Sequence, residues 1–185
     1  MNIYKIIPDE RTYGGLFFDG VLLRKTLGRQ LSRKLTSVTA SIADDWRDCD
    51  GWFSSLYDDS DIPVYPDLSV WKGSILVLSE RAEACLKKDL SPFGEFLPFT
   101  TDKGTFFLFV PHVVVDADAL KSERMIEEGA DIGPAKIVFT MESVGTNLIF
   151  KTEYDQYTSV FCTEKLKTLI SKAGLTGVAL SQDLV

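Results

Sequence analysis

Alternating apolar and polar residues predict most of the strands of this chain. Residues 137–142, 148–152 and 157–161 each follow the two-residue period of a half-buried strand. Gly145 lies in a short connection between the first two and favours a turn there. The longer apolar stretch at 105–115 predicts the central strand of the sheet.

Helical spacing and capping residues predict three helices. Leucines recur every four residues over 23–35, which indicates an amphipathic helix weakened by Gly28. Residues 79–90 begin with a capping serine. Thr163 is placed to cap a last helix, and Gly174 lies where a left-handed residue ends it. The expected fold is α+β, with a mixed, largely antiparallel sheet, a few helices packed against it and a C-terminal strand-strand-strand-helix-strand unit.

Length and composition indicate one folded, soluble domain. The 185 residues can bury one substantial core, and 45% of them are apolar. We expect a single domain over 1–185, and leave open a smaller N-terminal subdomain at 1–61 beside a main domain at 62–185. No export signal or membrane span is evident, and three scattered cysteines are typical of reduced thiols. The expected location is therefore the cytoplasm.

Acidic residues are concentrated in one window. The chain carries a net charge of -7, and residues 44–61 alone hold seven aspartates against Arg47. Aromatic residues interleave with them (Trp46, Trp52, Phe53, Tyr57). Such a window is either a solvated loop or a face that binds a partner through aromatic anchors. The residues predicted to contact a partner are Asp44, Asp45, Asp48, Asp50, Trp52, Tyr57, Asp58 and Asp59.

Catalytic and metal-binding patterns are weak. A calcium-loop reading of Asp48 to Gly51 fails because Trp46 and Tyr57 occupy ligand positions. His112 is the only histidine and interrupts an apolar run, which favours a structural role. No phosphate-binding loop or pair of metal ligands occurs, so we expect no enzyme activity, cofactor or metal. The basic residues on the 23–35 helix indicate a solvated face, so we expect no nucleic-acid binding.

Three pieces of the chain resemble one known family when taken in order. They are Pro66-Asp67-Leu68 followed by ILVLSERA, then TFFLFVPHVVVDADALKSE, then LIFKTEYDQYTSVFCTEKLKTLISKAGLTGVAL. Together they cover residues 66–180 and resemble a family of bacterial polymorphic-toxin immunity proteins. The resemblance implies a non-enzymatic cytoplasmic protein that neutralises a cognate toxin or effector by binding and occluding it. It implies no catalytic motif and no particular binding surface.

Two other functions remain open beside this one. The first is a carboxylate-based hydrolase with a site at His112, Asp116 and Asp118. The second is a structural or oligomeric scaffold. For the leading hypothesis we expect a toxin partner with a basic surface, because charge complementarity speeds association with an acidic protein. A homodimer is also left open.

Overall fold

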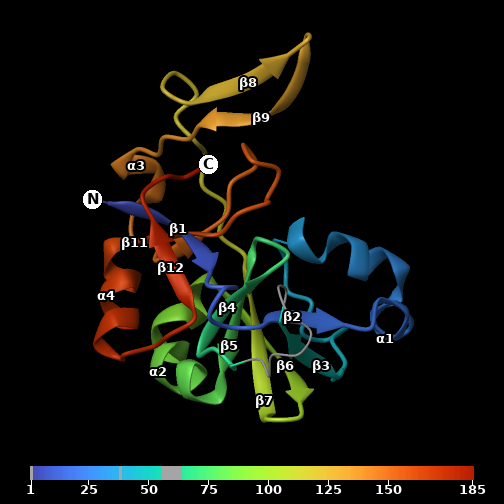
Figure 1. Cartoon of the computed structure of the whole chain (residues 1–185). Helices are drawn as coiled ribbons and strands as arrows, with labels where there is room; N and C mark the ends of the chain where they lie inside the picture. The colour runs from blue at the N-terminus through green and yellow to red at the C-terminus, as the bar shows by residue number, and fades with distance from the viewer. Residues whose placement is uncertain (1, 38, 56–63) are drawn as a thin grey trace.

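Two four-stranded antiparallel sheets form the body of the protein (Figure 1). The computed structural model describes residues 2–37, 39–55 and 64–185, without the side chains of residues 31–34. The first sheet contains β10 (Ile149–Phe150), β11 (Phe161–Thr163), β1 (Ile3–Pro8) and β12 (Val178–Ser181), in that order. The second contains β4 (Leu68–Trp71), β5 (Ile75–Ser79), β7 (Gly104–Pro111) and β6 (Gly94–Thr101). The remaining strands form two pairs, β2 (Gly15–Phe18) with β3 (Gly51–Ser54) and β8 (Glu123–Glu127) with β9 (Ala130–Lys136). The α-helices are α1 (Gly20–Lys34), α2 (Glu80–Leu90), α3 (Met141–Val144) and α4 (Glu164–Lys172), and short 3-10 turns are η1 (Leu35–Ser37) and η2 (Ser91–Phe93).

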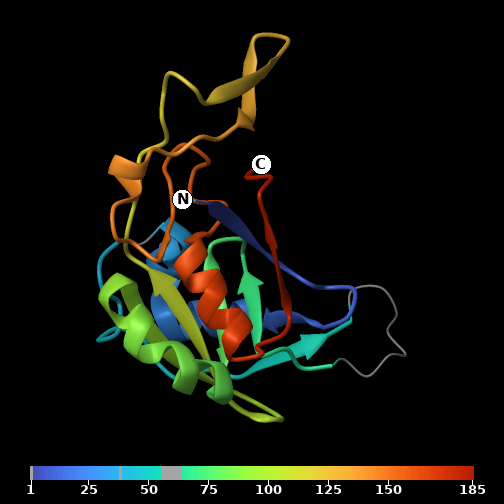
Figure 2. The same cartoon turned by 90° about the vertical axis from the view of Figure 1, so that its left-hand side faces the viewer.

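The main core joins the two large sheets through helices α2 and α4. These helices lie side by side in both views (Figures 1 and 2). Leu86 of α2 and Leu166 of α4 are buried in the same cluster as Ile6 of β1 and Leu78 of β5. Because β1 lies between β11 and β12, the first strand of the chain is held by its last elements.

A second core packs residues of the first third of the chain against the sheet β4-β5-β7-β6. Leu23 and Trp46 are buried there with Phe99 and Leu108. Residues before 56 therefore share both cores with the rest of the chain. The predicted subdomain boundary at 61 and 62 lies outside the described residues and stays a prediction.

The β8–β9 hairpin projects away from this body (Figures 1 and 2). Most of its residues are exposed, including the aliphatic side chains of Met125, Ile126 and Ile132. Beneath it, a small third core contains Val115 and Phe150 among its buried residues. In the part of the chain that the structure describes, no helix has the length and apolar character needed to cross a membrane.

The predicted α+β class is confirmed, and several helix signals act as expected. The Ser79 hydroxyl accepts a hydrogen bond from the Ala82 amide at 3.2 Å, which caps α2. Gly28 interrupts α1 with a non-helical backbone at φ 76° and ψ 156°. Gly174 has φ 59°, the left-handed conformation predicted for the residue that ends α4. Thr163 precedes α4 as predicted, but its hydroxyl makes no capping hydrogen bond.

The first part of the predicted C-terminal unit is wrong. Residues 137–140 form no strand, and Met141–Val144 form helix α3. Thr140 and Ser143 cap that helix reciprocally, and this local hydrogen bonding outweighs the alternation of apolar and polar residues.

The predicted strand at 157–161 is also wrong over most of its length. Residues 154–157 form a turn, and only Phe161 of the predicted range lies in a strand.

A junction between β4 and the turn after α4 connects the two large sheets. The Asp67 carboxylate accepts hydrogen bonds from the Arg81 guanidinium at 2.8 Å and from the Thr176 amide and hydroxyl, each at 3.1 Å. The Leu68 amide donates to the Thr176 carbonyl at 2.8 Å. Gly177 has φ 106°, and a Cβ there would lie 2.2 Å from the Leu68 carbonyl oxygen. The junction therefore requires glycine at position 177.

Gly177→Ala should destabilise the fold more than Gly174→Ala does. Both positions have positive φ, but a Cβ at Gly174 would meet no atom closer than 3.8 Å. We expect about 1 kcal/mol for Gly174→Ala from backbone strain alone. For Gly177→Ala we expect roughly 2–4 kcal/mol, because the backbone must also move apart. Chemical denaturation of the two variants and the parent measures both values. Equal losses would show that the close approach to Leu68 contributes nothing.

Candidate functional site

The segment 41–50 lies along the edge of β6 in a fixed arrangement. The buried side chains of the segment are Ile42, Trp46 and Cys49, and Trp46 is only 7% exposed. Asp50 forms an isolated bridge with Thr100 of β6. The acidic window therefore begins as an ordered segment with one buried side, because a buried apolar side chain recurs every three to four residues.

Hydrogen bonds to β6 hold the segment at both ends. The Glu95 carboxylate accepts from the Ser41 hydroxyl at 2.6 Å and from the Ile42 amide at 2.8 Å. The Trp46 indole nitrogen donates to the Pro98 carbonyl at 2.7 Å, and the Thr100 amide donates to the Cys49 carbonyl at 3.0 Å. These bonds satisfy the polar groups that burial of the segment would otherwise leave unpaired.

The four aspartates of this segment all face outward. Asp44, Asp45, Asp48 and Asp50 are exposed. Among residues 2–37, 39–55 and 64–185, no ion pair involves any of these four carboxylates. The Arg47 guanidinium between them donates instead to the backbone carbonyls of Asp44 and Trp46, at 2.8 and 2.7 Å. The Asp48 carboxylate also accepts a hydrogen bond from the Thr100 hydroxyl at 3.3 Å, and all four side chains remain exposed to solvent.

An exposed aromatic pair lies on β3, the strand that follows Asp50, and on its partner strand β2. Trp52 of β3 and Phe17 of β2 are register partners, with ring centroids 6.3 Å apart in a stacked arrangement. Trp52 is 46% exposed and Phe17 is 37% exposed. We call the six residues the acidic strip: Asp44, Asp45, Asp48, Asp50, Trp52 and Phe17. Sequence reasoning missed Phe17, although its place opposite Trp52 would follow from pairing the two short strands.

Two of the aromatic residues in the acidic window are not available as anchors. Trp46 and Phe53 are both buried in the second core, with exposed fractions of 7% and 4%. Alternation along β3 explains the difference, because Trp52 and Phe53 point to opposite faces. Tyr57, Asp58 and Asp59 lie outside the described residues, so their predicted contacts stay predictions.

The thiol of Cys49, buried within the segment 41–50, is held unreactive. Burial raises its pKa to about 12, and the neighbouring charges of Asp48 and Asp50 add to the effect. A thiolate is the nucleophilic form of cysteine, so this group does not provide covalent chemistry near neutral pH.

His112 lies beside Glu95 instead of beside the aspartates of the alternative hydrolase site. Its Nε2 is 3.4 Å from the Glu95 carboxylate, which also accepts from Ser41. In a Ser-His-acid arrangement the histidine must lie between the hydroxyl and the carboxylate to take the proton. Here the Glu95 carboxylate lies between Ser41 and His112, so this order of groups does not let His112 take the proton of the Ser41 hydroxyl.

The other members of that alternative site are engaged elsewhere or exposed. Asp118 pairs with Lys121 at 2.9 Å, and that hydrogen bond holds the pKa of Asp118 below its usual value. Asp116 is exposed. Among the described residues, no hydrogen bond or ion pair joins His112 to Asp116 or Asp118. Groups of three or more His, Cys, Asp or Glu side chains that could hold a metal ion are absent from the same residues.

Lys151 is a buried charged group directly after β10. Its side chain is fully buried, and its Nζ donates to the Thr36 carbonyl at 3.0 Å. Burial lowers the pKa of Lys151 from 10.5 to about 8. The hydrogen bond ties the C-terminal unit to the end of the α1 region, which indicates a structural role.

Comparisons with known proteins give no family for the chain. No protein-family model matches it, and no curated protein sequence matches it either.

The buried Lys151 should give stability a specific pH dependence. Because its pKa in the folded protein is about 8, against 10.5 for an unshifted lysine, the unfolded state binds more protons between these pH values. The penalty of burying the charged lysine is present below about pH 8 and is lost as pH rises. We therefore expect the parent to gain roughly 3 kcal/mol relative to Lys151→Met between pH 7 and 11.

Urea denaturation of both proteins across this pH range measures the difference directly. Other titrating groups cancel between the parent and Lys151→Met. A difference in unfolding free energy that stays constant with pH would contradict the lowered pKa.

Proposed function

We propose that this protein is a non-enzymatic cytoplasmic binding protein that neutralises a basic bacterial toxin or secreted effector by occluding it. One observation carries the proposal: the acidic strip combines four exposed carboxylates on the ordered segment 41–50 with an exposed aromatic pair on the adjoining strands β2 and β3. A basic cleft on the toxin would neutralise the carboxylates, and Trp52 and Phe17 would supply apolar contacts between the charges. Tryptophan is among the residues that most often dominate binding energy at such surfaces.

The order of the strip favours binding over a solvated loop. A flexible loop pays conformational entropy when it binds, whereas the segment 41–50 is already fixed by its contacts to β6. Clustered like charges also repel one another, which disfavours the folded state until a partner of opposite charge is bound. Both effects make the strip a better interface than a charge cluster on a free loop.

The family resemblance supports the class of function and leaves the surface undetermined. Its motif residues Asp67, Ser79, Thr176 and Gly177 form the junction between the sheets or cap a helix. These residues account for a fold shared with the family, whereas the acidic strip lies outside residues 66–180. The toxin contact proposed here therefore rests on the geometry and charge of this chain.

The direct test of the function is neutralisation of a toxin encoded beside this protein. Co-expression should restore growth of cells that produce the toxin, and the purified proteins should form a one-to-one complex. Failure of both assays with the neighbouring toxin would contradict the proposal.

Neutralising the aspartates of the strip should slow association with the toxin. In a variant with Asp44→Asn, Asp45→Asn, Asp48→Asn and Asp50→Asn, we expect an association rate roughly tenfold lower at low salt. The dependence of that rate on salt should also become flatter, because fewer charges are screened. Stopped-flow or surface-based kinetics at two salt concentrations measures both quantities.

A matched variant separates local charge from net charge. Four exposed carboxylates outside the strip can be converted to amides: Asp116, Glu142, Glu153 and Asp183. This variant has the same change in net charge and should keep most of the association rate. If the two variants slow association equally, the strip is not the contact surface. Unfolding midpoints of both variants check that the fold is intact.

A further inference from the structure

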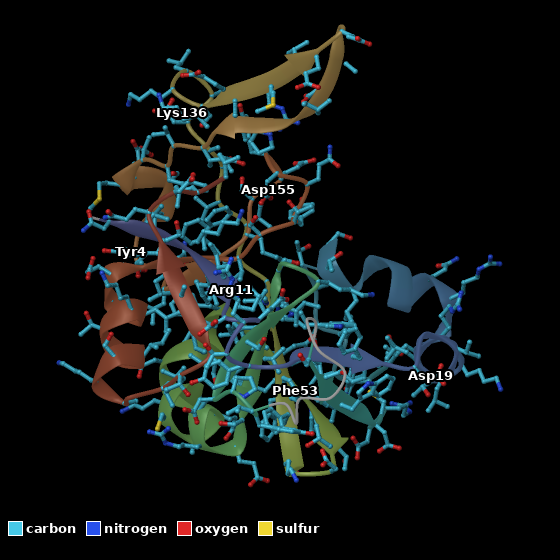
Figure 3. All side chains as sticks on the ribbon, viewed as in Figure 1. Tyr4, Arg11, Asp19, Phe53, Lys136 and Asp155 are labelled. Atoms are coloured by element: carbon cyan, nitrogen blue, oxygen red, sulfur yellow. The ribbon has the colours of Figure 1, made fainter. Side chains whose placement is uncertain are left out.

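Two adjoining cavities lie beneath the β8–β9 hairpin. Their volumes are about 310 and 280 Å³. Both are lined by Ile132, Gly133 and Pro134 of β9 and by Asp155 and Thr158 of the loop between β10 and β11. Figure 3 labels Asp155 on this loop, between the hairpin and the body of the protein. Together the cavities can accept a small ligand or one long side chain.

The Asp155 carboxylate is buried without a hydrogen bond of normal geometry. The residue is 5% exposed, and neither carboxylate oxygen has a hydrogen-bond partner. Burial raises the pKa of Asp155 above its usual value, and the nearby Ser159 hydroxyl, the backbone amides of Thr158 and Tyr157 and the charge of Lys5 only partly oppose this shift. A buried carboxylate in this state is costly unless a cation or a donor compensates it.

The nearest guanidinium is already engaged by other groups. Arg124 of β8 donates to both carboxylate oxygens of Asp131, at 2.8 to 3.1 Å, and to the carbonyl of Tyr154. Lys5 of β1 lines the smaller cavity, but no ion pair between Lys5 and Asp155 occurs in the described chain. Among the described residues, the Asp155 carboxylate therefore forms no ion pair with Arg124 or Lys5, although the charges of both cations act on it.

Backbone hydrogen bonds hold the loop in an uncommon conformation around this carboxylate. Gln156 and Tyr157 both have left-handed φ values, 58° and 60°, which are unfavourable for residues that carry a side chain. The Gln156 amide donates to Glu153 at 2.8 Å, and the Tyr157 amide donates to Thr152 at 3.1 Å. Asp155 is thereby fixed in place before any ligand arrives.

The lining of the cavities selects an organic cation. A metal ion would need several oxygen, nitrogen or sulfur ligands, and no group of three suitable side chains occurs in the described ranges. Aliphatic side chains of Met125, Ile132 and Ile137 line the smaller cavity together with Asp155, beside polar residues and Lys5. Such a lining contacts the methylene stem of an arginine or lysine while the carboxylate binds the charged head.

We propose that these cavities bind a guanidinium or alkylammonium group, carried by a basic side chain of a protein partner, with Asp155 as its counter-ion. The exposed Met125, Ile126 and Ile132 of the hairpin would contact the surrounding surface of that partner. The choice of a protein source rests on the proposed function, whereas the cation site itself does not. A second copy of this chain, with net charge -7, is a poor source of the cation.

Titration of the whole protein with three probes, followed by backbone NMR, tests the site. The probes are agmatine, the peptide acetyl-Gly-Arg-Gly-amide and the neutral peptide acetyl-Gly-norleucine-Gly-amide. We expect the arginine peptide to shift the amides of Gly133, Thr158 and Ser159, and the norleucine peptide to leave them unchanged. Asp155→Asn should weaken arginine-peptide binding about tenfold or more, and the exposed control Asp116→Asn should not.

Three results would overturn the proposal. Equal shifts with the norleucine peptide, or binding that survives Asp155→Asn, would exclude a cation site. Binding of agmatine without the arginine peptide would show a site for free amines instead of a protein side chain. None of these probes involves the toxin, so failure here is distinct from failure of toxin neutralisation.

Thermal unfolding provides a second measurement on the same variant. If the Asp155 charge is uncompensated in the free protein, Asp155→Asn should raise the unfolding midpoint at pH 7, whereas Asp116→Asn should leave it unchanged. A lowered midpoint for Asp155→Asn would show that the carboxylate stabilises the loop and that its partner is structural.

Discussion

The close approach of Gly177 to the start of β4 is the constraint on which the arrangement of the two large sheets depends. Because Gly177 has no side chain, the turn after α4 can approach the Leu68 backbone. The Asp67 carboxylate then accepts hydrogen bonds from both Arg81 and Thr176. This places β12 beside β1 and lets one core extend across both large sheets. It also gives a physical reason for the Pro-Asp and Leu-Thr-Gly motifs, since both lie in the same junction.

The frame presents two acidic features of different kinds. In the acidic strip, β6 provides Glu95, Pro98 and Thr100 as fixed partners for the segment 41–50, and the carboxylates remain in solvent. At Asp155 a single carboxylate is withdrawn into a cavity and loses its hydration. Exposed charges mainly speed association, whereas a buried counter-ion mainly affects dissociation and specificity. The two surfaces would therefore contribute differently to one complex.

Local sequence signals predicted the elements whose stability is local. Ser79 begins α2, and Gly174 ends α4 with the expected left-handed backbone. The helix at Met141–Val144 was missed because reciprocal capping by Thr140 and Ser143 outweighs a short alternating pattern. The exposure of the four strip aspartates follows from the buried residues between them, but their alignment on β6 depends on contacts about fifty residues apart. Asp155 could not be identified either, because its burial depends on a hairpin whose strands carry few core residues.

The central claim is that the acidic strip is an ordered surface before a partner binds and is covered when one does. Amide hydrogen exchange over residues 41–52, with and without the proposed toxin partner, tests both parts. The amides of Asp45 and Trp46 donate to the Ile42 carbonyl at 3.0 and 2.9 Å, so they should exchange slowly in the free protein and more slowly in the complex. Rapid exchange in the free protein, or protection in the complex that spares residues 41–52, would contradict the account.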